Sequence, residues 1–298
     1  MKKVLLFALA LTLMSPIAVA QSLNKEINPS GKSPSLLGKI NKEGLSGDNY
    51  GSWFTKNFDS YLPNQNSIDS LESHLSKYTI TAFMGTWCGD SKREVPKFYK
   101  VLDEANFPLE RLTMVAVSRG RETYKQSPGG EHEGVNIHRV PTFIIYKNGK
   151  EVNRIVEKPV TSLEEDLMNI VEKNYTSNYH GVTLVNELLT ELDTRSFNKK
   201  QKRLLPELKK QVKGTRELNT YASVLFSAHK KEEAIIAARI NTLLFPEEAS
   251  TYTSLANKLA KTDKQDEALE NYEKALALDP DYKQAKSGIE SLKTTKTQ

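Results

Sequence analysis

The sequence predicts an α/β domain built on a mixed sheet, followed by an all-helical domain. Between residues 51 and 175, apolar runs of strand character alternate with amphipathic helical segments. From residue 181 to residue 298, only the helical period of 3.6 residues is found. Alternating helices and strands are typical of a sheet with helices on its faces, whereas a purely helical pattern predicts helix-on-helix packing.

The N-terminal segment, 1–20, has the pattern of a secretory signal peptide. Lys2 and Lys3 precede an apolar run from Val4 to Met14, and residues 18–20 form a small-residue cleavage site. The run is shorter than the ~20 residues that a membrane span needs, although an uncleaved anchor is the alternative. We therefore expect an exported protein, periplasmic or secreted, with no membrane span after signal removal.

Residues 21–50 are rich in Ser, Asn, Gly and Lys, and we expect them to form a flexible lead-in. The elements of the α/β domain then follow from local patterns. One helix has the aromatic residues Trp53, Phe54, Phe58 and Tyr61 on one side, with Ser52 as its cap, and a second turns Ile68, Leu71 and Leu75 inward. Strands are expected at Tyr78–Met84, Leu112–Val117, Thr142–Tyr146 and Glu151–Val156, and helices at Cys88–Ala105 and Ser162–Lys173.

Two short motifs fix connections in this domain. Asn148-Gly149 between two strand-like runs is a strong hairpin signal. Ser162 and Glu165 form a capping box that begins the last helix of the domain.

The chain contains a single cysteine, Cys88, where a predicted strand leads into a helix. Free backbone N–H groups and the helix dipole favour a thiolate at this place. Lys92 and Arg93 add positive potential, and Asp90 opposes it. Because there is no second cysteine, an internal disulfide is excluded, and Cys88 is either a free thiol or one that pairs with another molecule.

Three motifs in the same order as in the thioredoxin family give residues 51–175 a resemblance to that family. They are Trp87-Cys88-Gly89-Asp90-Ser91, Pro96 further along the helix that follows the cysteine, and the segment from Val140-Pro141 to Lys150. The resemblance implies a thioredoxin fold with a cis bond between Val140 and Pro141 that faces Cys88. It also implies that the Val140 backbone pairs with a substrate chain, while Trp87 shields one side of the sulfur.

The sequence departs from the family at two positions that carry redox chemistry. Ser91 stands where the family has its second cysteine, and Ala82 stands where it has a buried acid. We therefore expect Cys88 to be a nucleophile that forms mixed disulfides with exported clients or reduces their sulfenic acids. Ser91 would donate a hydrogen bond to the thiolate, and an external thiol would release the client. The alternative is a non-catalytic scaffold in which both halves bind protein partners.

The helical half contains an internal repeat. Ala268 follows Ala234 at the same interval at which Pro280 follows Pro246. This pattern resembles tetratricopeptide repeats, with units at 215–248 and 249–282 and a capping helix from Lys283 to Leu292. The resemblance implies a concave face that binds a peptide, and a stabilising appendage is the alternative.

Composition and charge exclude other classes of function. Lys and Arg number 42 against 37 Asp and Glu, an excess too small and too mixed to indicate nucleic acid. His132 and His138, with Glu131 and Glu133 nearby, match no metal-site spacing, so we expect a solvated loop and no metal or cofactor. A basic run is expected to form the solvent-exposed face of a helix; it comprises Lys199, Lys200, Lys202, Arg203, Lys209, Lys210 and Lys213.

Overall fold

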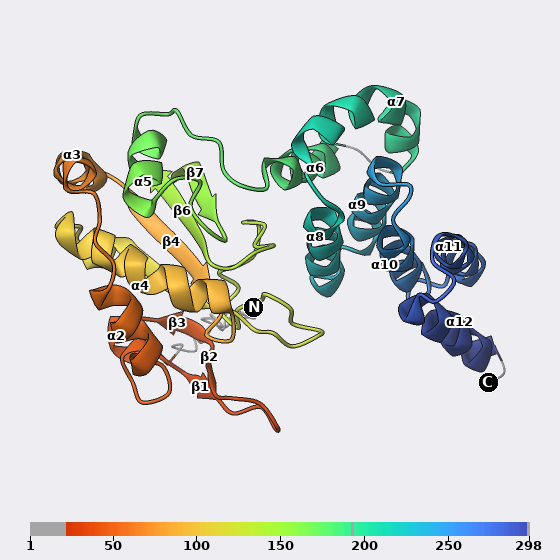
Figure 1. Ribbon diagram of the computed structural model, residues 1–298, viewed down its shortest axis with the longest axis horizontal. Helices are drawn as coiled ribbons and strands as arrows, with labels where there is room; N and C mark the ends of the chain where they lie inside the picture. The colour runs from red at the N-terminus through yellow and green to blue at the C-terminus, as the bar shows by residue number, and fades with distance from the viewer. Residues whose placement is uncertain (1–21, 192–193, 297–298) are drawn as a thin grey trace, which may run out of the picture.

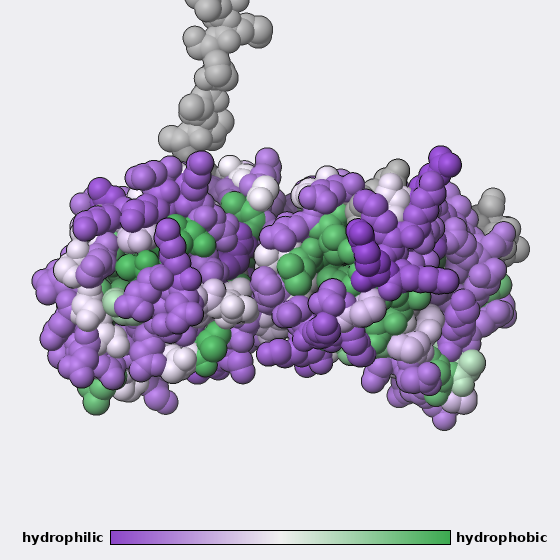
Figure 2. Space-filling view, turned by 90° about the horizontal axis from the view of Figure 1, so that it is seen from above, coloured by the Kyte–Doolittle hydropathy of each residue, from purple (hydrophilic) through white to green (hydrophobic). Residues whose placement is uncertain are grey.

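The computed structural model describes residues 22–191 and 194–296, so the predicted signal peptide lies outside the described residues. An α/β part, up to residue 171, is followed by a helical part from residue 180 onward (Figure 1). Each part has its own hydrophobic core. The surface seen in Figure 2 is mostly hydrophilic on both parts. Within the described ranges, every helix is too short or too polar to cross a membrane.

A five-stranded sheet with the order β3-β5-β4-β6-β7 forms the centre of the α/β part. Its strands are β3 (Gly38–Ile40), β4 (Thr79–Met84), β5 (Leu112–Ala116), β6 (Thr142–Lys147) and β7 (Lys150–Val156). Strands β4 and β5 are parallel, and the other neighbours are antiparallel. The sheet is therefore mixed, as predicted, and the buried strand β4 lies at its centre.

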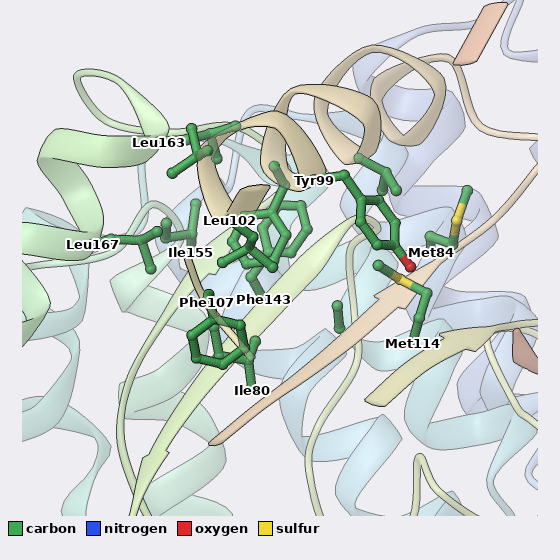
Figure 3. Close-up of a cluster of buried hydrophobic side chains, with 14 of the residues drawn as sticks. Ile80, Met84, Tyr99, Leu102, Phe107, Met114, Phe143, Ile155, Leu163 and Leu167 are labelled. Carbon is green, nitrogen blue, oxygen red and sulfur yellow. The ribbon is translucent and has the colours of Figure 1, made fainter. Parts of the chain in front are cut away.

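Four helices cover one face of this sheet: α2 (Gly51–Asp59), α3 (Gln65–Leu75), α4 (Gly89–Glu104) and α5 (Leu163–Val171). Figure 3 shows Tyr99 and Leu102 of α4 and Leu163 of α5 packed over strand residues that include Ile80 and Phe143. The Phe98 and Phe143 rings stack with centroids 4.0 Å apart. Because side chains alternate along a strand, Phe83, Val115 and Ile144 point to the opposite face.

That opposite face is covered by the segment 117–140, which contains no helix. The sequence predicts a long polar loop over 118–134, and the structure confirms it, so helices cover one face of the sheet and the segment that contains this loop covers the other. Its apolar residues Val117, Ile137 and Val140 fill the place of a helix face. They are too few and too widely spaced to form an amphipathic stripe, and Pro128-Gly129-Gly130 interrupts the chain between them.

The predicted hairpin turn and the predicted cap of the last helix in the α/β part are both present. Asn148 and Gly149 both have positive φ, 53° and 75°, and connect β6 to β7. Ser162 accepts a hydrogen bond from the Glu165 backbone N–H, 3.3 Å away, at the start of α5. The prediction of Ser52 as a cap is wrong, because α2 already begins at Gly51, so Ser52 lies inside the helix; the N-cap is Tyr50, which makes no side-chain cap hydrogen bond.

The prediction of a flexible lead-in is wrong over its described part, residues 22–50. This segment forms β1 (Glu26–Ile27), β2 (Ser35–Leu36), β3 and α1 (Lys42–Leu45), and β3 pairs antiparallel with β5. Leu36, Ile40, Leu45 and Tyr50 are buried in the core. A three-residue edge strand needs only two buried positions, and the exposed Lys39 between them gives the segment its polar composition.

The helical part consists of α6 (His180–Glu191), α7 (Thr194–Gln211), α8 (Thr215–Ser227), α9 (Lys231–Leu244), α10 (Ala249–Leu259), α11 (Gln265–Leu278) and α12 (Lys283–Lys296). The start of α10 follows the start of α8 at the same interval at which α11 follows α9, so the two helix pairs repeat in register. The small residues Ala234 and Ala268 are fully buried in the core of these helices. The seven predicted solvent-facing basic residues on and after α7 are all exposed, as expected.

Candidate functional site

Cys88 lies at the N-cap of α4, directly after the central strand β4. Its backbone N–H donates to Gly85 O at 2.8 Å, and its carbonyl accepts from Lys92 N at 3.0 Å, which closes the first turn of the helix. The thiol is therefore held at the carboxyl end of the central strand, beside the free N–H groups of a helix start.

The structure brings Cys88 next to the cis-proline segment, 52 residues further along the chain. The Val140–Pro141 bond is cis, as the resemblance implied. Cys88 Sγ donates a hydrogen bond to Val140 O, with a distance of 3.3 Å. The antiparallel register, which pairs Phe83 with Thr142, explains this contact because it places the end of β4 beside the start of β6.

Trp87 also lies at this edge. Its indole Nε1 donates to Val117 O at 2.9 Å. Its ring and Cys88 both pack against the apolar cluster on the sheet face that the segment 117–140 covers. A Cβ atom on Gly85 would be only 2.5 Å from the indole ring, so the glycine provides the space in which Trp87 lies.

Ser91 is completely buried one turn further along α4. Its Oγ accepts a hydrogen bond from Gly85 N at 3.2 Å, which joins the helix to the loop before Cys88. Among the hydrogen bonds of the described residues, none runs from Ser91 to Cys88; the contact made by the sulfur is with Val140 O. Cys88 itself is half-buried, intermediate between an exposed nucleophile and a buried core thiol.

Sequence reasoning missed Lys125, which lies in the segment 117–140. Lys125 is only 4% exposed, and its Nζ donates to His138 O at 2.5 Å. Burial and, after it, the charge of Arg139 lower the pKa of Lys125 to about 7, although the charges of Cys88 and Glu157 act in the opposite direction. A buried lysine within a polar loop has no sequence signal, because only the fold shows that the loop covers the sheet.

His138 was expected on a solvated loop, and this expectation is wrong. His138 is buried. Its ring makes edge-type contacts with the rings of Tyr179 and Tyr221, whose centroids lie 5.7 and 6.2 Å from its own. Burial, with the charges of Lys125 and Arg139, lowers its pKa to about 3, so the imidazole is neutral. His132 is a loop residue whose Nδ1 accepts from Ser127 N, and the described ranges hold no cluster of three metal-ligating side chains.

The same segment joins the α/β part to the helical part. Gln126 Nε2 donates to Ser227 O at 2.7 Å, and Ser227 Oγ donates to Arg121 O at 3.1 Å. Arg139 pairs with Glu157 at 3.0 Å and also donates to Arg216 O at the start of α8. The segment that covers one face of the sheet beside Cys88 is therefore also the one that contacts the helices.

The sheet order, the cis proline and the cysteine at the N-cap of α4 define a thioredoxin-like domain. No family model matches the chain, but curated thioredoxins match its N-terminal part. Thioredoxin Asp f 28 of Aspergillus fumigatus is 30% identical over 92 residues, which are 30% of this chain and 76% of that protein. Thioredoxin-1 of Schizosaccharomyces pombe is 27% identical over 97 residues, covering 30% of this chain and 79% of the relative.

A third relative is matched over a smaller share of its length. Thioredoxin-2 of Pyricularia oryzae is 28% identical over 92 residues, 31% of this chain, and the chain spans about half of that relative, 47%. Through its α/β part this chain belongs to the thioredoxin family. The relatives support a general thioredoxin-like redox role.

Proposed function

We propose that this protein is an exported monothiol exchanger of the thioredoxin family, in which Cys88 forms mixed disulfides with other exported proteins or reduces their sulfenic acids. The observation that carries the proposal is the 3.3 Å contact between Cys88 Sγ and Val140 O. It places the only thiol of the chain against the backbone that precedes the cis proline. In this proposal, the Val140 backbone and Pro141 form the substrate platform, and Trp87 shields the sulfur.

With a disulfide substrate, the Cys88 thiolate attacks one of the two client sulfurs. The client disulfide breaks, one sulfur leaves as a thiolate, and the other becomes bonded to Cys88. An external thiol then attacks the Cys88 sulfur and frees the client thiol. A second molecule of the external thiol restores Cys88 and leaves as the oxidised dimer, so the electrons come from two external thiols.

With a sulfenic acid substrate, the Cys88 sulfur displaces the hydroxyl group from the client sulfur, and water is released. The resulting mixed disulfide is resolved by two external thiols in the same way. Ser91 cannot take the place of a resolving cysteine in either reaction, because a hydroxyl group does not reduce a disulfide. Its proposed role is to donate a hydrogen bond to the thiolate, which would need its hydroxyl to turn from the position seen in the structure.

The helical part supplies an interaction module in this proposal. Its two helix pairs, α8 with α9 and α10 with α11, repeat at a constant interval and support a tetratricopeptide-like stack with α12 as the capping helix. The signal pattern of residues 1–20 supports export, and an oxidising compartment is where client disulfides persist.

The experiment that tests the proposal is client capture by the purified protein. We expect covalent adducts with proteins of an oxidised exported fraction, seen on non-reducing gels and released by a small thiol. A Cys88→Ser variant should form none. Partners that bind equally well to the Cys88→Ser variant, with no covalent adduct from either protein, would instead establish the scaffold.

A further inference from the structure

A polar groove runs along α8, α10 and the start of α12, and the segment 117–140 contributes Arg121 and Tyr124 to its wall. Its volume is about 680 Å³. An adjoining hollow of about 610 Å³ continues past α12 and shares Arg121 and Lys261 with it. The groove is therefore composite, since both the thioredoxin-like part and the helical part build it.

The charge of the groove is of one sign. The groove and the adjoining hollow together are lined by the cationic residues Arg121, Arg216, Lys258, Lys261 and Lys283, and no aspartate or glutamate of the described ranges lines either of them. None of the five forms an ion pair within residues 22–191 and 194–296, although the full sequence is nearly balanced, with 42 basic and 37 acidic residues. These side chains are therefore free to pair with acidic groups of another molecule.

Lys258 lies close enough to Lys261 for the two positive charges to repel each other. The residue is 6% exposed, and within the part of the chain that the structure describes its Nζ donates only to Ser254, at 3.2 Å to the backbone oxygen and 3.1 Å to Oγ. Burial, followed by the charge of Lys261, lowers the pKa of Lys258 to about 8. An anion in the groove would relieve this repulsion.

Neutral donors line the same walls. The Oδ1 atom of Asn219 accepts from Asn241 Nδ2, and that of Asn257 accepts from Tyr272 OH. The side-chain N–H groups of both asparagines therefore remain as donors in the groove wall. Thr253 is 4% exposed, and its Oγ1 has no hydrogen-bond partner among the described residues. Cations, amide donors and an unpartnered hydroxyl together are complementary to carboxylates.

We propose that this groove binds an acidic segment of the client polypeptide whose oxidised sulfur reacts with Cys88. The inference rests on the proposed function, because it names the class of client. Tyr124 lines the groove, and the next residue, Lys125, donates to His138 O two residues before the Val140 carbonyl that contacts Cys88. Burial and, to a smaller extent, the charge of Cys88 raise the pKa of Tyr124, so the thiol lies near the Tyr124 end of the groove.

A polypeptide fits this site better than a flat anionic surface does. Lys258 and Thr253 are almost completely buried, so only a chain that enters the groove reaches them. The mixture of side-chain amides and hydroxyls also suits peptide groups beside the carboxylates.

The test is fluorescence anisotropy with the whole purified protein and a labelled glutamate-rich decapeptide. A decapeptide with glutamine at every glutamate position is the neutral probe. The groove variant is Arg121→Gln/Arg216→Gln/Lys261→Gln, whose three side chains are exposed and unpaired. The matched control is Lys199→Gln/Lys200→Gln/Lys202→Gln on α7, which removes the same charge from exposed positions.

We expect the acidic peptide to bind, the neutral one to bind at least tenfold more weakly, and added salt to weaken binding. The groove variant should lose about tenfold in affinity, as three weak charge contacts imply, and the control less than twofold. Equal losses in both variants, or tighter binding of a labelled oligonucleotide than of the peptide, would overturn the proposal.

Failure of this inference and failure of the proposed function give different results. If the groove variant still forms Cys88 adducts with a small disulfide such as oxidised glutathione while peptide affinity falls, both stand. If the wild-type protein forms adducts but binds no acidic peptide, only the groove proposal fails. If it binds the peptide but Cys88 forms no adduct, the exchange function fails, and the groove remains a site for acidic peptides but not for a client of Cys88.

Discussion

At the scale of single residues, His138 shows how the junction between the two parts depends on pH. The neutral imidazole lies between Tyr179 and Tyr221, with Lys125 and Arg139 as the charged groups that act on it. Its pKa in the folded protein is about 3, against 6.5 ordinarily. Between these values the unfolded chain binds a proton that the folded protein does not, so the free energy of unfolding falls as the pH falls.

A His138→Phe variant keeps the aromatic packing and removes this titration. Each pH unit below 6.5 costs the wild type about 1.4 kcal/mol that the variant does not lose. We therefore compare the free energy of unfolding of the variant with that of the wild type. This difference should be about 2 kcal/mol more in favour of the variant at pH 5 than at pH 7.5. Urea unfolding at both pH values measures it, and a difference independent of pH would show that the histidine is not buried in neutral form.

Gly85 controls the position of Trp87 beside the thiol. An alanine Cβ would lie 2.5 Å from the indole, so Gly85→Ala should displace the ring and break its bond to Val117 O. We expect a loss of about 1–3 kcal/mol of stability. In a Trp53→Phe background the emission of Trp87 should also shift. The matched control is Gly89→Ala, where nothing lies within 4 Å, and similar effects in both variants would contradict this role.

At the scale of elements, the features that depend on neighbouring residues could be predicted from the sequence, whereas those that depend on distant residues could not. The hairpin at Asn148-Gly149 and the cap at Ser162 depend on residues within one turn, and both were predicted. The contact between Cys88 and Val140 was reached only through the family resemblance, since it joins residues 52 positions apart. Strand β3 and the buried Lys125 were missed, because their burial depends on sheet pairing and on a loop that covers the sheet.

Helix α12 offers a test of packing at this scale. Gly288 faces Tyr272 of α11 so closely that an added Cβ would overlap the tyrosine ring, whose hydroxyl is held by Asn257. Glycine to alanine inside a helix ordinarily gains about 1 kcal/mol.

We expect the opposite sign for Gly288→Ala, a loss of about 1–3 kcal/mol, because the ring is almost completely buried and must give up its bond to Asn257 to move away. Hydrogen exchange should show faster opening of α12. Ser287→Ala, at the neighbouring exposed position, should leave both quantities nearly unchanged. A stabilising effect of Gly288→Ala would mean that α12 does not pack on Tyr272.

At the scale of the whole molecule, the segment 117–140 connects the redox site to the helical part. It covers the sheet face with Val117, Ile137 and Val140, and it contacts the helices through Gln126 and Arg139. In a chain whose only thiol has no resolving partner, client retention depends on contacts outside the cysteine. The composite groove beside this segment supplies such contacts in our proposal.

The central claim is that the fold makes Cys88 a reactive thiol, and its alkylation rate tests this most directly. The rate constant would be measured at pH 7 in the folded protein and in the same protein unfolded in urea, with Cys88→Ser as the blank. The account predicts faster alkylation in the folded protein, because Cys88 lies at the N-cap of α4, beside the free backbone N–H groups of the helix start. A folded-state rate equal to or below that of the unfolded chain would contradict it.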